Sequence, residues 1–182
     1  KLVQPQLRSS FRWDLQQEKP FEIFGIAAWR DSSVYVFDDS LLEEEKPFGV
    51  DGGKVAETSL GLLWERRDSE WVPREGWRLE IGARWTVWTW GQGPYGGPMA
   101  DLRHYLPLGE RSVLASRLKA EWLFGKVPFY EMVHWGGLLN IQGFGGSDTM
   151  RGVAVGRWRA PGKAVGNLEL RTEIFEHRLF KK

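Results

Sequence analysis

Apolar and polar residues alternate with a period of two along most of this 182-residue chain. Such alternation is typical of β-strands whose two faces meet different surroundings. Residues 77–87 give the clearest example, with tryptophan, leucine, isoleucine and valine on one face and arginine, glutamate and threonine on the other. At about 3.3 Å per residue, a strand of this length can cross a bilayer at a tilt.

The same pattern recurs, and it predicts strands along the whole chain. The predicted strands are residues 7–14, 21–30, 56–65, 77–87, 99–106, 113–124 and 164–174. No stretch has the period of an amphipathic helix. We therefore expect an all-β chain of about eight antiparallel strands in up-and-down order.

Turn-forming residues predict the connections between these strands. A turn is expected at residues 16–20, a long mobile loop at residues 38–53, and a tight loop at residues 91–97. Residues 34–37 either extend the second strand or begin an excursion from it. A second long loop, which carries a glycine-rich stretch, precedes the last strand.

Two architectures fit this alternation: a soluble sandwich or barrel with its polar face in water, and a membrane barrel with its polar face in the lumen. The polar faces carry dense charges of both signs: Arg78, Glu80, Arg84, Arg117, Lys119, Glu121, Glu169, Arg171 and Glu173. The chain also has 11 tryptophans and 10 phenylalanines, several of them near predicted strand ends. Aromatic residues gather in this way at membrane interfaces, so we favour the membrane barrel.

Composition sets further bounds on the chain. Its length predicts one domain, residues 1–182, and its formal net charge of +1 gives no reason to expect nucleic acid as a partner. It has no cysteine, which excludes disulfides, and no apolar run reaches the roughly 20 residues of a membrane helix. Because the chain starts with Lys1 and residues 179–182 carry no helix cap or turn, we expect it to be truncated at both ends.

Signals for catalysis are weak. The three histidines, His104, His134 and His177, lack the spacing of metal ligands, and no nucleophile or phosphate-loop motif is present. The acidic run at residues 43–45 is interpreted as a solvated loop. We therefore expect neither an enzyme nor a cofactor or metal.

The glycine-rich stretch at residues 145–153 contains a single arginine, Arg151. This arginine is either a solvated loop cation or a group placed against a partner. If the loop folds back into a barrel, Arg151 can reach Glu169 on the polar face of the last strand. In a narrow lumen with little water, an arginine–carboxylate pair is stronger and more directional than at a surface.

Several blocks resemble the barrel of the BamA/TamA surface-antigen family in the outer-membrane protein 85 superfamily, and they occur in the family's order. They are Leu60-Gly61-Leu62-Leu63, Arg67-Asp68, Pro73-Arg74-Glu75-Gly76, Tyr105-Leu106-Pro107-Leu108, Val127-Pro128-Phe129-Tyr130-Glu131, Gly145-Gly146-Ser147, Met150-Arg151-Gly152 and Asn167-Leu168-Glu169-Leu170-Arg171. The resemblance is strongest over residues 60–171. Met150 and Val153 depart from the family's usual valine and aromatic residue at those positions.

The resemblance implies a segment of an outer-membrane barrel that has about sixteen strands when complete. It implies a sixth-loop motif, Met150, Arg151 and Gly152, whose arginine pairs with Glu169 in the lumen. It also implies a periplasmic turn motif made by Arg67, Asp68, Pro73 and Gly76.

The activity that the resemblance implies is insertion of outer-membrane proteins or transport of polypeptides, without nucleotide or metal. The implied partners are the lipid bilayer of the bacterial outer membrane, unfolded outer-membrane or secreted polypeptides, and accessory assembly proteins. The alternatives are a small pore or structural barrel and, further off, a soluble β-sandwich that binds a glycan.

Overall fold

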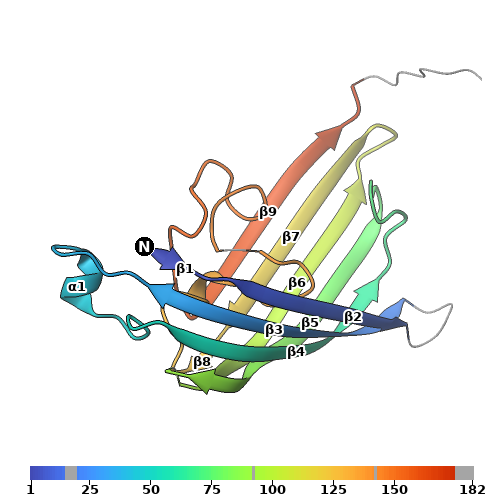
Figure 1. Ribbon diagram of the computed structural model, residues 1–182. Coiled ribbons are helices and arrows are strands. Elements are labelled where there is room, and N and C mark those ends of the chain that lie inside the picture. Colours follow the sequence, from blue (N-terminus) through green and yellow to red (C-terminus); the bar gives the residue numbers. More distant parts are fainter. Residues whose placement is uncertain (15–19, 92, 142, 175–182) are drawn as a thin grey trace, which may run out of the picture.

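A computed structural model describes residues 1–14, 20–91, 93–141 and 143–174. Within these residues the chain forms one antiparallel, up-and-down sheet of nine strands in the order β1-β3-β4-β5-β6-β7-β9, with β2 also paired to β3 and β8 to β6 (Figure 1). The strands are β1 (Leu2–Val3), β2 (Gln6–Asp14), β3 (Phe21–Val34), β4 (Gly53–Glu65), β5 (Gly76–Trp90), β6 (Tyr95–Pro107), β7 (Ser112–Trp122), β8 (Phe124–Gly125) and β9 (Gly162–Thr172). The sheet is a β-barrel segment, as predicted from the alternation together with the charged faces and the aromatic residues.

The charged face of this sheet is the buried one. On β5, Arg78, Glu80 and Arg84 are at most 7% exposed, whereas Ile81 on the other face is 44% exposed. The same contrast holds on the neighbouring strands, where Glu57, Asp101, Lys119 and Glu121 are buried and Leu60, Leu62, Leu102 and Leu118 are exposed. A soluble sandwich would pack its apolar faces together, so this arrangement favours a lipid-facing exterior and a polar interior.

Aromatic side chains lie near both ends of the strands. Phe21 stacks on Trp64, which meets Trp77 edge to face, at the end of β3 and β4 nearest the β4–β5 turn. Trp29 stacks on Trp88 toward the opposite end. Two aromatic groups separated along the strands match the girdles of a membrane barrel. No helix in the described ranges combines the length and apolar character needed to cross a bilayer.

The structure corrects two predicted connections and defines the end of the second strand. Residues 38–52 contain a short helix, α1 (Leu41–Glu45), because Ser40 caps its first turn and Lys46 ends it in the left-handed conformation. The predicted tight loop at residues 91–97 is shorter, since β6 already begins at Tyr95, which is buried. The second strand continues to Val34, and most of the predicted turn at residues 16–20 lies outside the described residues.

Candidate functional site

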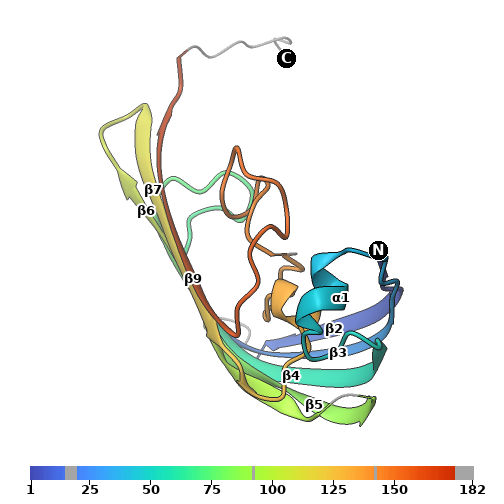
Figure 2. The same ribbon diagram turned by 90° about the vertical axis from the view of Figure 1, so that its left-hand side faces the viewer.

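The long loop at residues 126–161, which we call the inner loop, lies on the concave face of the sheet (Figure 2). It includes the short 3-10 helix η1 (Glu131–Val133). Its start is anchored by an apolar cluster of Val55, Tyr95, Leu123 and Val127, and its middle by Trp135 and Ile141 against Val165. The backbone N–H of Phe129 also donates to the carbonyl of Phe48, beyond α1, at 3.1 Å. The inner loop is therefore a packed part of the interior.

Glu131 is the buried ionic anchor at the start of the inner loop. Its carboxylate is 0% exposed and accepts from Arg30 Nε at 2.9 Å, from Gln4 Nε2 at 2.8 Å and from the Tyr95 hydroxyl at 2.9 Å. Arg30 also donates to Glu57 at 2.9 Å. A buried carboxylate is tolerated when its oxygens are satisfied in this way. These contacts tie η1 to β3, to β6 and to the segment between β1 and β2.

The network continues across the wall through Arg84, whose side chain is 1% exposed. Arg84 donates to Glu57 at 3.0 Å, to Glu121 at 2.7 Å and to the carbonyl of His134 at 2.9 Å. Lys163 of β9 pairs with Glu121 at 2.9 Å and also donates to the same His134 carbonyl. Strands β3, β4, β5, β7 and β9 thus hold one segment of the inner loop through alternating charges.

His134 sits inside this network but outside the strands. Its Nε2 lies 2.9 Å from the side-chain oxygen of Gln4. Burial, followed by the positive charges of Arg30, Arg84 and Lys163, lowers the pKa of the imidazole to about 3. His134 is therefore neutral at physiological pH and acts as a packed hydrogen-bonding residue.

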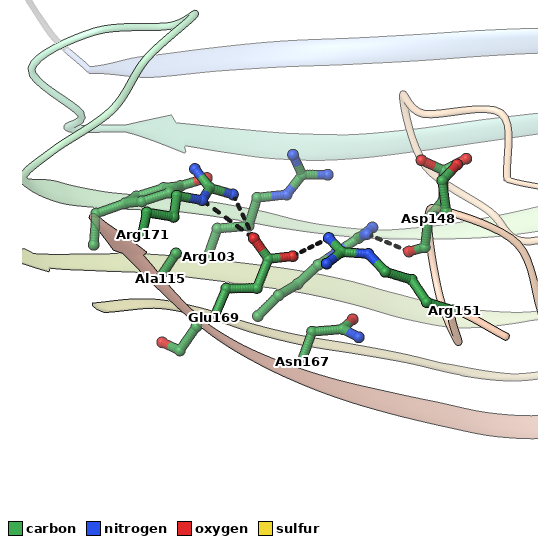
Figure 3. A pocket seen from close by; sticks show the side chains of 11 residues that line it. Arg103, Ala115, Asp148, Arg151, Asn167, Glu169 and Arg171 are labelled. Carbon is green, nitrogen blue, oxygen red and sulfur yellow. Dashed lines mark hydrogen bonds and ion pairs between the residues drawn. The ribbon is translucent and has the colours of Figure 1, made fainter. Parts of the chain in front are cut away.

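Arg151 lies at the far end of the inner loop, and its guanidinium donates to the Glu169 carboxylate of β9 (Figure 3). Glu169 also accepts from Arg171 at 3.1 Å. The structure thus brings together the two residues that the sequence paired. The surroundings differ from the expected water-poor lumen, because the Arg151 side chain is 71% exposed and Glu169 is 29% exposed. Beside the pair is a polar cavity of about 210 Å³.

Two further hydrogen bonds fasten the backbone next to Arg151. Arg117 donates to the carbonyl of Asp148 at 2.9 Å, and Asn167 donates to the carbonyl of Thr149 at 2.7 Å. Gly152 has a φ of +83°, which a glycine adopts without strain, while Met150 is 39% exposed. The motif therefore works as a turn that presents one arginine to the wall.

The predicted turn motif forms the connection between β4 and β5. Arg67 makes a two-pronged ion pair with Glu65 at 2.6 and 2.8 Å. The Asp68 carboxylate accepts from the backbone N–H groups of Glu75 and Arg74, and these bonds lower the pKa of Asp68. Pro73 lies within this turn, and Gly76, at φ +96°, begins β5. The four predicted residues are thus structural elements of one turn.

Comparison with known families bears directly on this geometry. A sequence model described as the Omp85 superfamily domain matches residues 49–180. The chain belongs to the Omp85 superfamily. A search of curated proteins returned no match. Members of this superfamily are outer-membrane β-barrel proteins of the insertion and transport machinery. The apolar exterior described above therefore corresponds to the surface that faces the lipid of the outer membrane, and the polar interior to the lumen.

In this Omp85 chain the sequence did not reveal the buried network around Arg84. The charged residues of the polar faces are visible in the sequence, and Glu131 is the last residue of the block 127–131, which resembles the family. Strand register and loop path, however, decide which charges meet. Within the described ranges, no cluster of three or more histidine, aspartate or glutamate side chains is arranged to hold a metal ion.

Proposed function

We propose that this chain is the barrel region of an outer-membrane machine that inserts outer-membrane proteins or transports polypeptides. The observation that carries the proposal is the inner loop, which lies against the concave wall of an Omp85 barrel segment with Arg151 on Glu169. Unfolded outer-membrane or secreted polypeptides are the proposed substrates, with accessory assembly proteins as further partners. The proposed work involves no covalent chemistry, because it moves and inserts chains within the membrane.

A plain pore is the less suitable function for this geometry. The inner loop is fixed inside the wall by the buried Glu131, and Trp135 and Ile141 fill space beside β9. The interior of a porin-type barrel is instead a water-filled channel. A loop that is fixed firmly at its start and lightly at Arg151 suits a barrel whose interior rearranges as a polypeptide passes.

The test uses the full-length protein reconstituted in liposomes, with an unfolded outer-membrane barrel protein as substrate. The rate of substrate folding, followed by protease protection, should exceed the rate in protein-free liposomes. Arg151→Gln should leave the stability of the barrel within about 1 kcal/mol, because the pair is exposed, and should slow insertion severalfold. Arg157→Gln, an exposed arginine of the same loop, is the matched control.

Two results contradict the proposal. If the substrate folds no faster than in protein-free liposomes, the protein has no insertion activity. Steady ion conductance combined with the absence of any polypeptide insertion or passage would instead favour the pore.

A further inference from the structure

Three arginines face each other across adjacent strands on the polar face. In the register of the sheet, Arg78 of β5 lies opposite Arg103 of β6, and Arg103 lies opposite Arg117 of β7. Neighbouring strands are about 4.8 Å apart, and like charges directly opposite each other are destabilising. We call these three residues the arginine row. The repulsion within the arginine row lowers the stability of the sheet, and we therefore looked for a role that the three charges serve.

The carboxylates nearby do not neutralise the row evenly. Arg78 pairs with Glu80 at 3.0 Å and Glu65 at 3.4 Å. Three cations share the Asp101 carboxylate, with nitrogen–oxygen distances of 2.6 Å for Arg117, 3.4 Å for Arg103 and 3.7 Å for Lys119.

Arg103 is therefore the least satisfied member of the row. It lies between two arginines, and its two hydrogen bonds to Asp101, at 3.5 and 3.4 Å, are long for a charged pair.

Arg103 also stands between two cavities. It lines the polar cavity of about 210 Å³ that Arg151, Arg171 and Glu169 also line, and Figure 3 shows Arg103 among these side chains. It also lines a larger cavity of about 660 Å³, together with Arg12, Arg67, Arg78, Trp71 and one carboxylate residue, Glu70. Arg103, which has the longest hydrogen bonds of the row, thus lines both cavities.

Trp71 gives the larger cavity an apolar contact. It belongs to the β4–β5 turn and is 89% exposed, and the adjacent Val72 is 76% exposed. The lining of the larger cavity thus combines an exposed aromatic residue with four arginines and one glutamate.

We propose that the arginine row, centred on Arg103, and the exposed Trp71 bind acidic, partly apolar segments of polypeptides in the interior of the barrel. A carboxylate of the segment would accept two parallel hydrogen bonds from Arg103, the geometry that guanidinium groups favour. An adjacent apolar side chain would pack on Trp71. This inference rests on the proposed function, since it names the chemistry of the substrate that enters the interior.

The occupant is a polypeptide because of its combined chemistry. A small inorganic anion would use Arg103 but not Trp71, and the larger cavity exceeds the volume of one such anion. A lipid acyl chain meets the opposite, apolar face of the strands, where Leu102 and Leu118 are exposed. Charge complementarity with an acidic segment also relieves the repulsion within the row.

The test measures binding of a fluorescent peptide that alternates glutamate with leucine and phenylalanine. The binding partner is the full-length protein in detergent, and fluorescence anisotropy gives Kd. The loss of one charge-assisted contact in Arg103→Gln should weaken binding about tenfold. Trp71→Ala should also weaken it. Arg74→Gln is the control, because Arg74 belongs to the same turn but lines neither cavity. Binding should fall as salt rises, because salt screens exposed charges.

A second measurement separates binding from folding. Removing the charge of Arg103 relieves repulsion from its two neighbours, so the urea midpoint of Arg103→Gln should equal or exceed that of the wild type. A lowered midpoint together with unchanged peptide affinity would show that Arg103 is structural and would overturn the inference.

Two other results would also overturn it: equal binding of a peptide with lysine in place of each glutamate, and complete displacement of the peptide by millimolar phosphate. Insertion of barrel substrates at the normal rate by Arg103→Gln, combined with no acidic-peptide binding by the wild type, would refute this inference while leaving the proposed function standing. Tight peptide binding without insertion activity would refute the proposed function alone.

Discussion

The buried Glu131 offers the sharpest test of how the inner loop is held. Glu131→Gln keeps the shape of the side chain and removes its charge, which leaves Arg30 with Glu57 as its remaining carboxylate. Removing one partner of a buried ion pair costs about 3–5 kcal/mol. Because Arg30 and Arg84 then share Glu57, at 2.9 and 3.0 Å, we expect the lower end, about 3 kcal/mol, or roughly a hundredfold shift in the folding equilibrium.

Urea unfolding of the full-length protein in detergent measures this cost, and protease cleavage of the inner loop reports on its local release. Glu44→Gln, on the exposed helix α1, is the matched control and should change stability by less than about 0.5 kcal/mol. Adding Arg30→Gln to Glu131→Gln should cost less than the sum of the two single changes, because the uncompensated charge is gone. A Glu131→Gln protein as stable as the Glu44→Gln control would refute the assignment of Glu131 as an anchor.

Two further predictions concern the turn and the pH response. Gly76→Ala should destabilise the protein by more than about 1 kcal/mol, because a Cβ would lie 2.0 Å from a backbone carbonyl at φ +96°. Gly109→Ala, at φ +82° with open space around it, is the control, and equal urea midpoints for the two variants would contradict the steric argument. His134 has a pKa of about 3 in the folded protein, against about 6.5 unfolded, so its contribution to stability is full above pH 6.5 and is lost progressively as pH falls toward 3. The urea midpoint of His134→Gln should therefore fall less than that of the wild type between about pH 7 and pH 4.5, and parallel curves would refute the prediction.

The strands could be predicted from the sequence because the residues of each strand show by themselves which face is polar and which is apolar. Side chains alternate between faces with a period of two, so charges such as Glu80 and apolar residues such as Ile81 identify the two faces without knowledge of the partner strand. Helix α1 escaped prediction because a helix of five residues is too short to show a period, and its cap, Ser40, is a single polar residue in a polar loop.

The functional site likewise has a part that the sequence predicted and a part that it did not. Arg151 and Glu169 could be proposed from the sequence because each belongs to a short, ordered block and the pair needs only one loop to fold back. The ion network around Arg84 and the arginine row at Arg103 could not, since each joins residues that are distant in sequence and depends on strand register, where a shift of one residue moves every side chain to the other face.

By itself, then, the sequence determined an antiparallel, two-faced sheet and named the arginine of its inner loop. The tertiary structure confirmed that the charged face is the interior one, and it alone decided that Glu131 anchors the start of the inner loop and that Arg151 remains exposed. The physical reason is that alternation along a strand encodes a difference between two faces. Burial and ion pairing depend instead on which elements curve around each face.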